Sequence, residues 1–184
     1  MMHAFPTFET EHFSFGPVTY EDVPNLYTLF SDQETMKFDG GQTMQSMDEA
    51  YQFVQYFSVY NPEFPVLRWA IRSKDGRIFY GTGGFYKINL QHRRAEIGGE
   101  LLKQHWSKGV ATEAMSGIVN YGFNVLRLNR IMAMVAPDNK AANALINKGF
   151  FKREGCLRQW EKWGDRWVDL NIYSLLQEEW RKIK

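Results

Sequence analysis

The chain has 184 residues, 44% of them hydrophobic, which is enough for one domain with its own core and short for two. A net charge of +1 and a pI near 7.8 argue against a nucleic-acid-binding surface or a polybasic membrane anchor. The sequence has neither a secretory signal pattern nor an apolar run near the ~20 residues that span a bilayer. The single cysteine, Cys156, cannot form an internal disulfide, so we expect one domain over residues 1–184 and a cytoplasmic location.

Two helices are predicted in the first third of the chain. Residues 19–22 have the pattern of a capping box, so a first helix begins there and ends near Ser31. Residues 46–49 repeat that pattern, and apolar residues follow at helical spacing. The segment from Phe38 to Gln42, with two consecutive glycines, is expected to be a flexible loop.

The middle of the chain changes to alternating apolar and polar residues. This pattern predicts three strands, over residues 66–71, 77–88 and 93–102, with a turn at residues 74–76. Strands connected so closely form an antiparallel meander.

The second half alternates helices and strands. An amphipathic helix follows Gly109, and a shorter one opens at residues 137–139 and ends at Gly149. The predicted strands span residues 130–135, 150–159 and 167–176. Together, the segments indicate an α+β (mixed α/β) domain with a mixed, largely antiparallel sheet of about seven strands and about four helices.

A loop of small residues connects the strand over residues 93–102 to the helix after Gly109. The first N–H groups of a helix have no acceptor within it, and with the helix dipole they attract an anion. Gly109 and Ala111 keep side chains away from that site. The loop contains neither the P-loop pattern nor the glycines of the dinucleotide fingerprint, so its ligand is a different phosphate compound.

Ser107-Lys108-Gly109-Val110-Ala111 resembles the acetyl-coenzyme A loop of the GNAT superfamily of acetyltransferases, usually Gln/Arg-x-x-Gly-x-Gly/Ala. Trp106 stands where Gln or Arg is most common. Four phrases resemble the ribosomal-protein N-acetyltransferase branch: Ala95-Glu96-Ile97-Gly98, Trp106-Ser107-Lys108-Gly109, Ala111-Thr112-Glu113-Ala114 and Leu128-Asn129-Arg130-Ile131. Ser107 departs from the glycine usual in that branch. The order of strands and helices is also the order of a GNAT domain.

The resemblance implies acetyl-CoA as co-substrate. In the superfamily the strand before the loop splays from its neighbour and bonds the pantetheine through its backbone, while the loop backbone holds the pyrophosphate. The residues expected to bind the cofactor are Leu101, Leu102, Trp106, Ser107, Lys108, Gly109, Val110, Ala111, Thr112, Asn139 and Asn143. For Lys108, a solvated surface position is the more common role of such a residue.

Glu96 and Glu100 are the candidate catalytic residues. Their spacing of four on a strand places both side chains on one face, with Gly98 between them. A carboxylate there could remove the proton of an acceptor amine through water, and Glu96 resembles in position the general base of several family members. The alternative is that either one pairs with Arg93, Arg94 or another cation.

The group that protonates the departing thiolate is not evident. The branch commonly has Asn-x-x-Ser at the start of the short helix, and Asn139 is present, either to meet the pantetheine or as a plain helix cap, whereas Ala142 replaces the serine. Leu145 stands where many superfamily members have a tyrosine. Three possibilities remain. We favour the first, in which the thiolate leaves without a proton donor; in the second, water or Asn143 assists its departure, and in the third, turnover is slow.

The leading hypothesis is an acetyl-CoA-dependent N-acetyltransferase in which a primary amine attacks directly in a ternary complex. The acceptor is a protein N-terminal α-amine or a small molecule. A non-catalytic acyl-CoA-binding or sensing module is the alternative, and an unrelated phosphate-binding domain is a third reading. No nucleic-acid or membrane partner is expected, because the chain is nearly neutral. No metal is expected either, because His3, His12, His92 and His105 lack metal-ligand spacing.

The final hairpin region is rich in aromatic residues, among them Trp160, Trp163 and Trp167. Most such residues belong to the core. The topology of the branch suggests that some of them, with residues near Phe38, wall the acceptor cleft. An aromatic hairpin also makes a homodimer plausible.

Overall fold

The computed structural model describes residues 5–59 and 66–183. The helices are α1 (Val23–Ser31), α2 (Gln33–Met36), α3 (Met47–Phe57), α4 (Val110–Asn124), α5 (Lys140–Lys148) and α6 (Gln177–Ile183), with 3-10 turns η1 (Tyr20–Asp22) and η2 (Lys103–His105). The strands are β1 (Phe8–Glu9), β2 (Phe13–Gly16), β3 (Leu67–Ser73), β4 (Phe79–Asn89), β5 (Arg94–Leu101), β6 (Arg130–Val135), β7 (Lys152–Trp163) and β8 (Arg166–Leu176).

All these strands form one sheet with the order β1-β2-β3-β4-β5-β6-β8-β7. Only the β5–β6 pair is parallel among the described strands. The predicted mixed, largely antiparallel sheet is confirmed, with eight strands in place of about seven and six helices in place of about four. The differences come from very short segments such as α2 and β1, which hold too few residues to show a period, and from α6 at the end of the chain.

Local chemistry explains where the predicted helices begin. The Thr19 N–H donates to the Asp22 carboxylate at 2.7 Å, and the Ser46 hydroxyl accepts from the Glu49 N–H at 3.4 Å. The final hairpin is longer than predicted, because β7 continues to Trp163. Gly164 has a left-handed φ of 58°, which allows a tight turn directly between β7 and β8.

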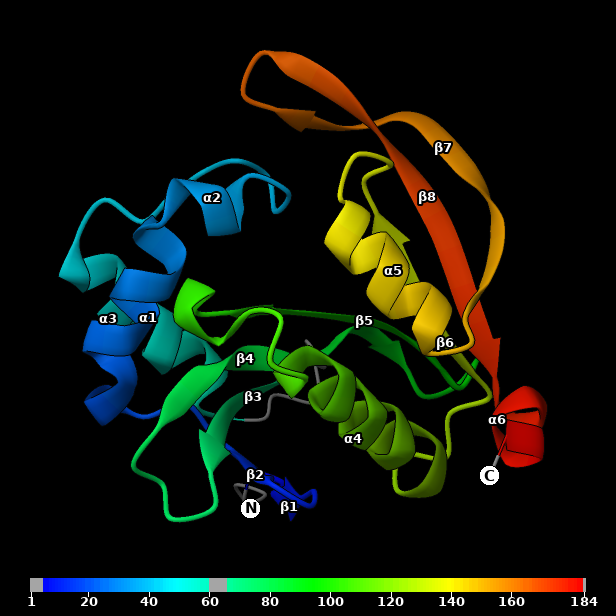
Figure 1. Ribbon diagram of the computed structural model, residues 1–184, viewed down its shortest axis with the longest axis horizontal. Helices are drawn as coiled ribbons and strands as arrows, with labels where there is room; N and C mark the ends of the chain where they lie inside the picture. Colours follow the sequence, from blue (N-terminus) through cyan, green and yellow to red (C-terminus); the bar gives the residue numbers. More distant parts are fainter. Residues whose placement is uncertain (1–4, 60–65, 184) are drawn as a thin grey trace.

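The two faces of the sheet carry different helices. Trp69, Ile71 and Ile97 point to one face and pack with α4 in the larger core cluster. Ala70 points to the opposite face and joins Leu102 in the cluster formed with α1 and α3. Figure 1 shows α1–α3 gathered together and set apart from α4 and α5, with the β7–β8 hairpin extending beyond α5. No helix among the described residues combines the length and apolar character needed to cross a membrane.

The pairing between β5 and β6 is incomplete. β5 pairs with β4 as far as Leu101, but it pairs with β6 only at three positions, the last being Glu96 with Met132. Beyond that pair the two strands separate, and the β5 edge facing β6 makes no ladder contact within the described part of the chain. Backbone N–H and C=O groups on such an edge need other partners.

Close packing of β3 on β4 requires glycine at position 84. A Cβ atom there would lie 1.8 Å from the Leu67 carbonyl oxygen and 2.9 Å from the Arg68 Cα. Because backbone atoms cannot rotate away, we expect Gly84→Ala to lower the free energy of unfolding by about 3 kcal/mol or more. Urea denaturation measures this change.

Gly155→Ala is the matched control for that variant. Gly155 lies in β7, and nothing lies within 4 Å of a Cβ built there. Its free energy of unfolding should stay within about 0.5 kcal/mol of wild type. Equal unfolding midpoints for the two variants would show that β3 and β4 do not approach this closely.

Candidate functional site

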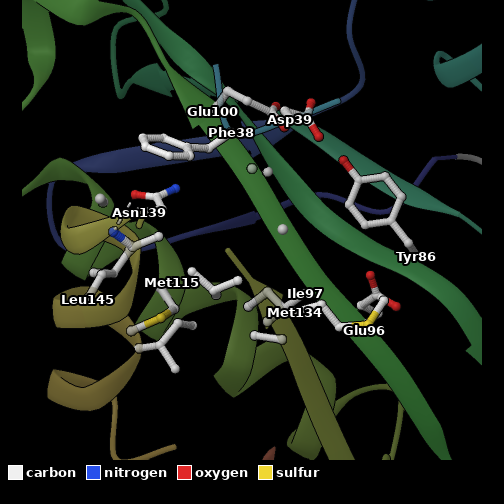
Figure 2. A pocket seen from close by; sticks show the side chains of 18 of the residues that line it. Phe38, Asp39, Tyr86, Glu96, Ile97, Glu100, Met115, Met134, Asn139 and Leu145 are labelled. Carbon is white, nitrogen blue, oxygen red and sulfur yellow. Dashed lines mark hydrogen bonds between the residues drawn. The ribbon is translucent and has the colours of Figure 1, made fainter. Parts of the chain in front are cut away.

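A cavity of about 580 Å³ opens where β5 and β6 separate. Its lining comes from β3 to β6, from α4 and α5, from the segment after α2 and from the β7–β8 hairpin. Figure 2 shows these side chains converging around the separated strands. The gap between the strands therefore connects the two faces of the sheet.

Strand alternation divides the lining into two sides. Ile97 and Leu101 belong to the core that packs with α4, so Glu96 and Glu100, at even positions, point to the opposite face. The first side, the helix side, includes Ala111, Met115, Ile118, Asn139, Ala142 and Leu145. The second, the carboxylate side, includes Phe38, Asp39, Arg68, Thr82, Tyr86, Met134, Glu161 and Trp163. Both predicted carboxylates thus reach one side of one cavity.

The loop before α4 presents helix N–H groups at its open end. Gly109 directly precedes α4 with a left-handed φ of 83°, and Ser107 is also left-handed with a φ of 58°. The Trp106 indole N–H donates to the Leu101 carbonyl oxygen at 2.8 Å, which ties the loop to the end of β5. The first N–H groups of α4 have no acceptor within the helix and favour a bound anion.

The residues predicted to bind the cofactor lie at several depths. Leu101, Ala111 and Asn139 line the cavity. Val110 is buried in the core, and Thr112 is half-buried in the first turn of α4. Those exposed in the loop are Trp106, Ser107, Lys108 and Gly109.

The main-chain groups of Leu102, predicted to bind the cofactor, both have partners within the chain. Its N–H donates to the Tyr80 carbonyl at 2.9 Å, and its own carbonyl accepts from the His105 N–H at 2.8 Å. Its side chain is buried with α1 and α3. Both backbone groups are used within the protein, because the chain turns into η2 here. The Leu101 carbonyl is likewise bonded by the Trp106 indole, so the N–H of Leu101 is the better candidate for a ligand contact.

The two asparagines of α5 have different surroundings. Asn139 caps the helix, since its Oδ1 accepts from the Ala142 N–H at 3.0 Å, while its amide nitrogen donates to no described residue. Asn143 donates to the Ala136 and Asn139 carbonyls at 2.9 and 2.7 Å and accepts from the Tyr173 hydroxyl at 2.6 Å. Only Asn139 lines the cavity, and a role for Asn143 toward a ligand stays a prediction.

Glu96 pairs with a cation that the sequence did not single out. Lys87 on β4 donates to its Oε2 at 3.0 Å. The lysine is largely exposed, whereas the Glu96 side chain keeps 20% exposure. An exposed lysine is a mobile partner, so this pair can open at little cost.

Glu100 is held much more firmly. Arg68 forms an ion pair with its Oε2, and the Thr82 hydroxyl reaches the same oxygen at 3.3 Å. Burial raises the pKa of the Glu100 carboxyl to about 7, the Arg68 charge opposes that rise, and the Asp39 charge adds to it. Because this pKa is about 4.5 when the chain is unfolded, folding becomes less favourable as the pH rises from about 4.5 to about 7.

Arg68 is buried within aromatic side chains. Its guanidinium carbon lies 5.2 to 5.6 Å from the ring centres of Phe30, Phe53, Phe57 and Tyr86. These ring faces attract the cation and exclude water from it. The arginine is thereby fixed beneath Glu100.

Sequence reasoning missed Arg68 and treated Asp39 only as part of a loop. The one signal for Arg68 was a charged residue inside a strand whose neighbours Leu67 and Trp69 are apolar. Asp39 had no signal, because it meets Glu100 only through the fold. Of the aromatic residues expected at the acceptor cleft, Phe38 and Trp163 line the cavity.

The other aromatic and histidine residues named from the sequence lie elsewhere. Trp160 and Trp167 are 52% and 58% exposed. His3 lies outside the described residues, and His12 bonds Glu113 at 2.8 Å. Within residues 5–59 and 66–183, no three His, Cys, Asp or Glu side chains are grouped to hold a metal ion.

Comparison with known proteins gives the same kind of fold. Residues 13–151 match the family described as Acetyltransferase (GNAT) domain. The chain is 37% identical over 173 residues to the protein of Bacillus subtilis (strain 168) named Uncharacterized N-acetyltransferase YoaA, covering 94% of this chain and 98% of that one. It is 25% identical over 168 residues to the ribosomal-protein-serine acetyltransferase of Escherichia coli (strain K12), covering 90% and 93%.

A solved structure also superimposes on the chain. The spermidine N-acetyltransferase from Vibrio cholerae, crystallised in complex with CoA and spermine, matches with a TM-score of 0.81 and 21% identity. The match covers 94% of this chain and 99% of the other. At this identity the likeness concerns the fold.

The electrostatic arrangement around Glu100 predicts the effect of removing its cation. Arg68→Met eliminates the charge that stabilises ionised Glu100, so the pKa of this carboxyl should rise further above 7. Carbon-13 NMR titration of the Glu100 carboxyl measures it. Arg72→Met is the matched control, because Arg72 pairs with Asp22 and should leave Glu100 unchanged. An unaltered or lowered Glu100 pKa in Arg68→Met would contradict this account.

Proposed function

Because the chain belongs to the GNAT acetyltransferase family, we propose that this N-acetyltransferase moves the acetyl group of acetyl-CoA to a primary amine by direct attack in a ternary complex. The observation that carries the proposal is the separation of β5 from β6 after Glu96 and Met132. It opens one cavity to both faces of the sheet, so a donor on the helix side and an acceptor on the carboxylate side can meet.

The helix side fits coenzyme A in three respects. The unpaired edge of β5 offers backbone groups to an extended chain with amides, as pantetheine is. The Asn139 amide nitrogen is available at the same wall. The loop ending in Gly109 presents the N–H groups of α4 to the pyrophosphate. The bound coenzyme would supply an acyl group already activated as a thioester.

The carboxylate side supplies a proton acceptor. An amine attacks only when neutral, so the site must take a proton from the incoming ammonium. Glu100 suits this role, because its pKa of about 7 lies near the working pH and its side chain lines the cavity. The sequence put Glu96 first, but the Glu96 side chain is more exposed than that of Glu100, at 20% against 12%, and it is paired with Lys87. We assign the proton transfer to Glu100.

The steps after the attack, in which the carbon–sulfur bond breaks and the thiolate leaves, need no further catalytic group. Once nitrogen has bonded to the thioester carbon, the carbon–sulfur bond breaks and its electron pair leaves with sulfur, while the second amine proton passes to solvent. Ala142 and Leu145 line the cavity where a serine or a tyrosine would protonate the sulfur. A thiol is acidic enough, with a pKa of ~8.5 for cysteine, to leave as thiolate. We propose that it leaves unassisted.

The same two residues favour one alternative, a non-catalytic acyl-CoA-binding module. Its wall at Ala142 and Leu145 would hold a thioester without a proton donor. Thiol release from acetyl-CoA against a panel of amines separates the two functions. Binding without turnover of any amine supports the module, whereas amine-dependent thiol release supports the enzyme.

Cofactor affinity should depend on the left-handed residue before α4. A side chain at position 109, where φ is 83°, costs roughly 1–2 kcal/mol, so the loop of Gly109→Ala relaxes and binding must restore it. We expect the Kd for acetyl-CoA to rise about tenfold by calorimetry, with Gly155→Ala as an unchanged control. Failure of the wild-type protein to bind at tens of micromolar would reject acetyl-CoA as the donor.

Catalysis should report the protonation of Glu100. Because the protonated carboxyl cannot accept a proton, kcat/KM should fall about tenfold per pH unit below 7. Glu100→Gln should lower the rate by about 10²-fold or more and remove this acidic limb. Glu96→Gln, the matched variant on the same face, should keep the limb. The reverse pattern would transfer the proton-accepting role to Glu96.

A further inference from the structure

The cavity wall carries excess negative charge. Its charged residues are four carboxylates, Asp39, Glu96, Glu100 and Glu161, and two cations, Arg68 and Lys87, so the net charge with all groups ionised is two negative. Lys87 and Arg68 each neutralise one glutamate, and the Glu161 carboxylate accepts from the Trp163 indole at 2.8 Å. Within the described part of the chain, the Asp39 carboxylate forms no ion pair with a cation.

Asp39 and Glu100 lie beside each other at one end of the cavity, as Figure 2 shows. Asp39 raises the pKa of the Glu100 carboxyl through its negative charge and, when one of the two groups is protonated, through a hydrogen bond between them. The turn that places Asp39 is well defined: the N–H groups of Asp39 and Gly41 both donate to the Met36 carbonyl at 3.0 Å. Gly40 and Gly41 have left-handed φ values of 75° and 70°, which glycine adopts without strain.

Asp39 and Glu100 together carry two negative charges, and the buried Arg68 supplies only one positive charge beside them. The pair therefore lacks a second cation. An ammonium group supplies that charge and donates up to three hydrogen bonds to the two carboxylates. In an α-amino acid, the carboxylate next to the amino group would instead be held within a few ångströms of Asp39 and Glu100. Like charges at such a distance repel strongly where water is excluded.

We propose that Asp39 and Glu100 together bind the ammonium group of the acceptor and that they select amines without an adjacent carboxylate over the corresponding amino acids. The inference rests on the proposed function, since it concerns the acceptor of the same site. Asp39 is the specificity-determining residue, and Glu100 serves both binding and proton transfer. Small alkylamines and peptide N-termini satisfy this requirement, whereas free α-amino acids do not.

Matched pairs of ligands test the selection directly. Tyramine and tyrosine, agmatine and arginine, and histamine and histidine differ only by the carboxylate. Calorimetry with the full chain saturated with coenzyme A measures their binding without any reaction. We expect each amine to bind about tenfold or more tightly than its amino acid, the effect of one charge-assisted contact.

Asp39→Asn should remove most of that preference. The variant keeps the turn and the side-chain size, so amine binding should weaken about tenfold while amino-acid binding changes little. Asp39→Glu should restore part of the preference. Asp48→Asn, an exposed position on α3, is the control and should match wild type.

Three results would overturn the assignment: equal affinity for amine and amino acid in the wild type, an unchanged preference in Asp39→Asn, or no binding by any of the three amines. A failure of the proposed function looks different. In that case mass spectrometry with acetyl-CoA finds no acetylated amine, although the amines still bind and still depend on Asp39.

Discussion

The site depends on one interruption in the backbone hydrogen bonding of the sheet. β5 pairs with β4 as far as Leu101 but leaves β6 after Glu96 and Met132, and one cavity opens at the gap that results. The alternation of a strand then assigns a different chemistry to each face. Apolar residues and helix ends reach one side of the gap, and carboxylates reach the other. No side chain alone could achieve this division, because it follows from the two-residue period of β5.

A buried arginine fixes the charge on the carboxylate side of the cavity. Arg68 is buried under aromatic rings, so its positive charge stays in place and holds Glu100 through Oε2. That contact keeps the carboxyl from becoming permanently protonated, while burial and Asp39 keep its pKa from falling to the ordinary value. The balance of these opposing effects produces a group that exchanges a proton near neutrality. Glu96, with an exposed lysine as its partner, has no comparable constraint.

Features with a local cause could be predicted from the sequence, and those made by distant segments could not. The helix starts at Thr19 and Ser46 and the strand that begins at Arg130 lie where the sequence places them, because each depends on neighbours within four residues. The shared side of Glu96 and Glu100 follows from strand periodicity. Arg68, however, meets Glu100 across 32 positions. Asp39 likewise comes from a separate loop, so neither contact has a sequence pattern.

The open edge of β5 also matters to the empty protein. An unpaired strand edge can act as a template for other chains, and here helices on both faces restrict access to it. A ligand lying along the edge would complete the interrupted ladder, and it would bind the folded chain without binding the unfolded one. Cellular abundance of such a ligand would then govern how long each molecule resists degradation, in addition to how fast it works.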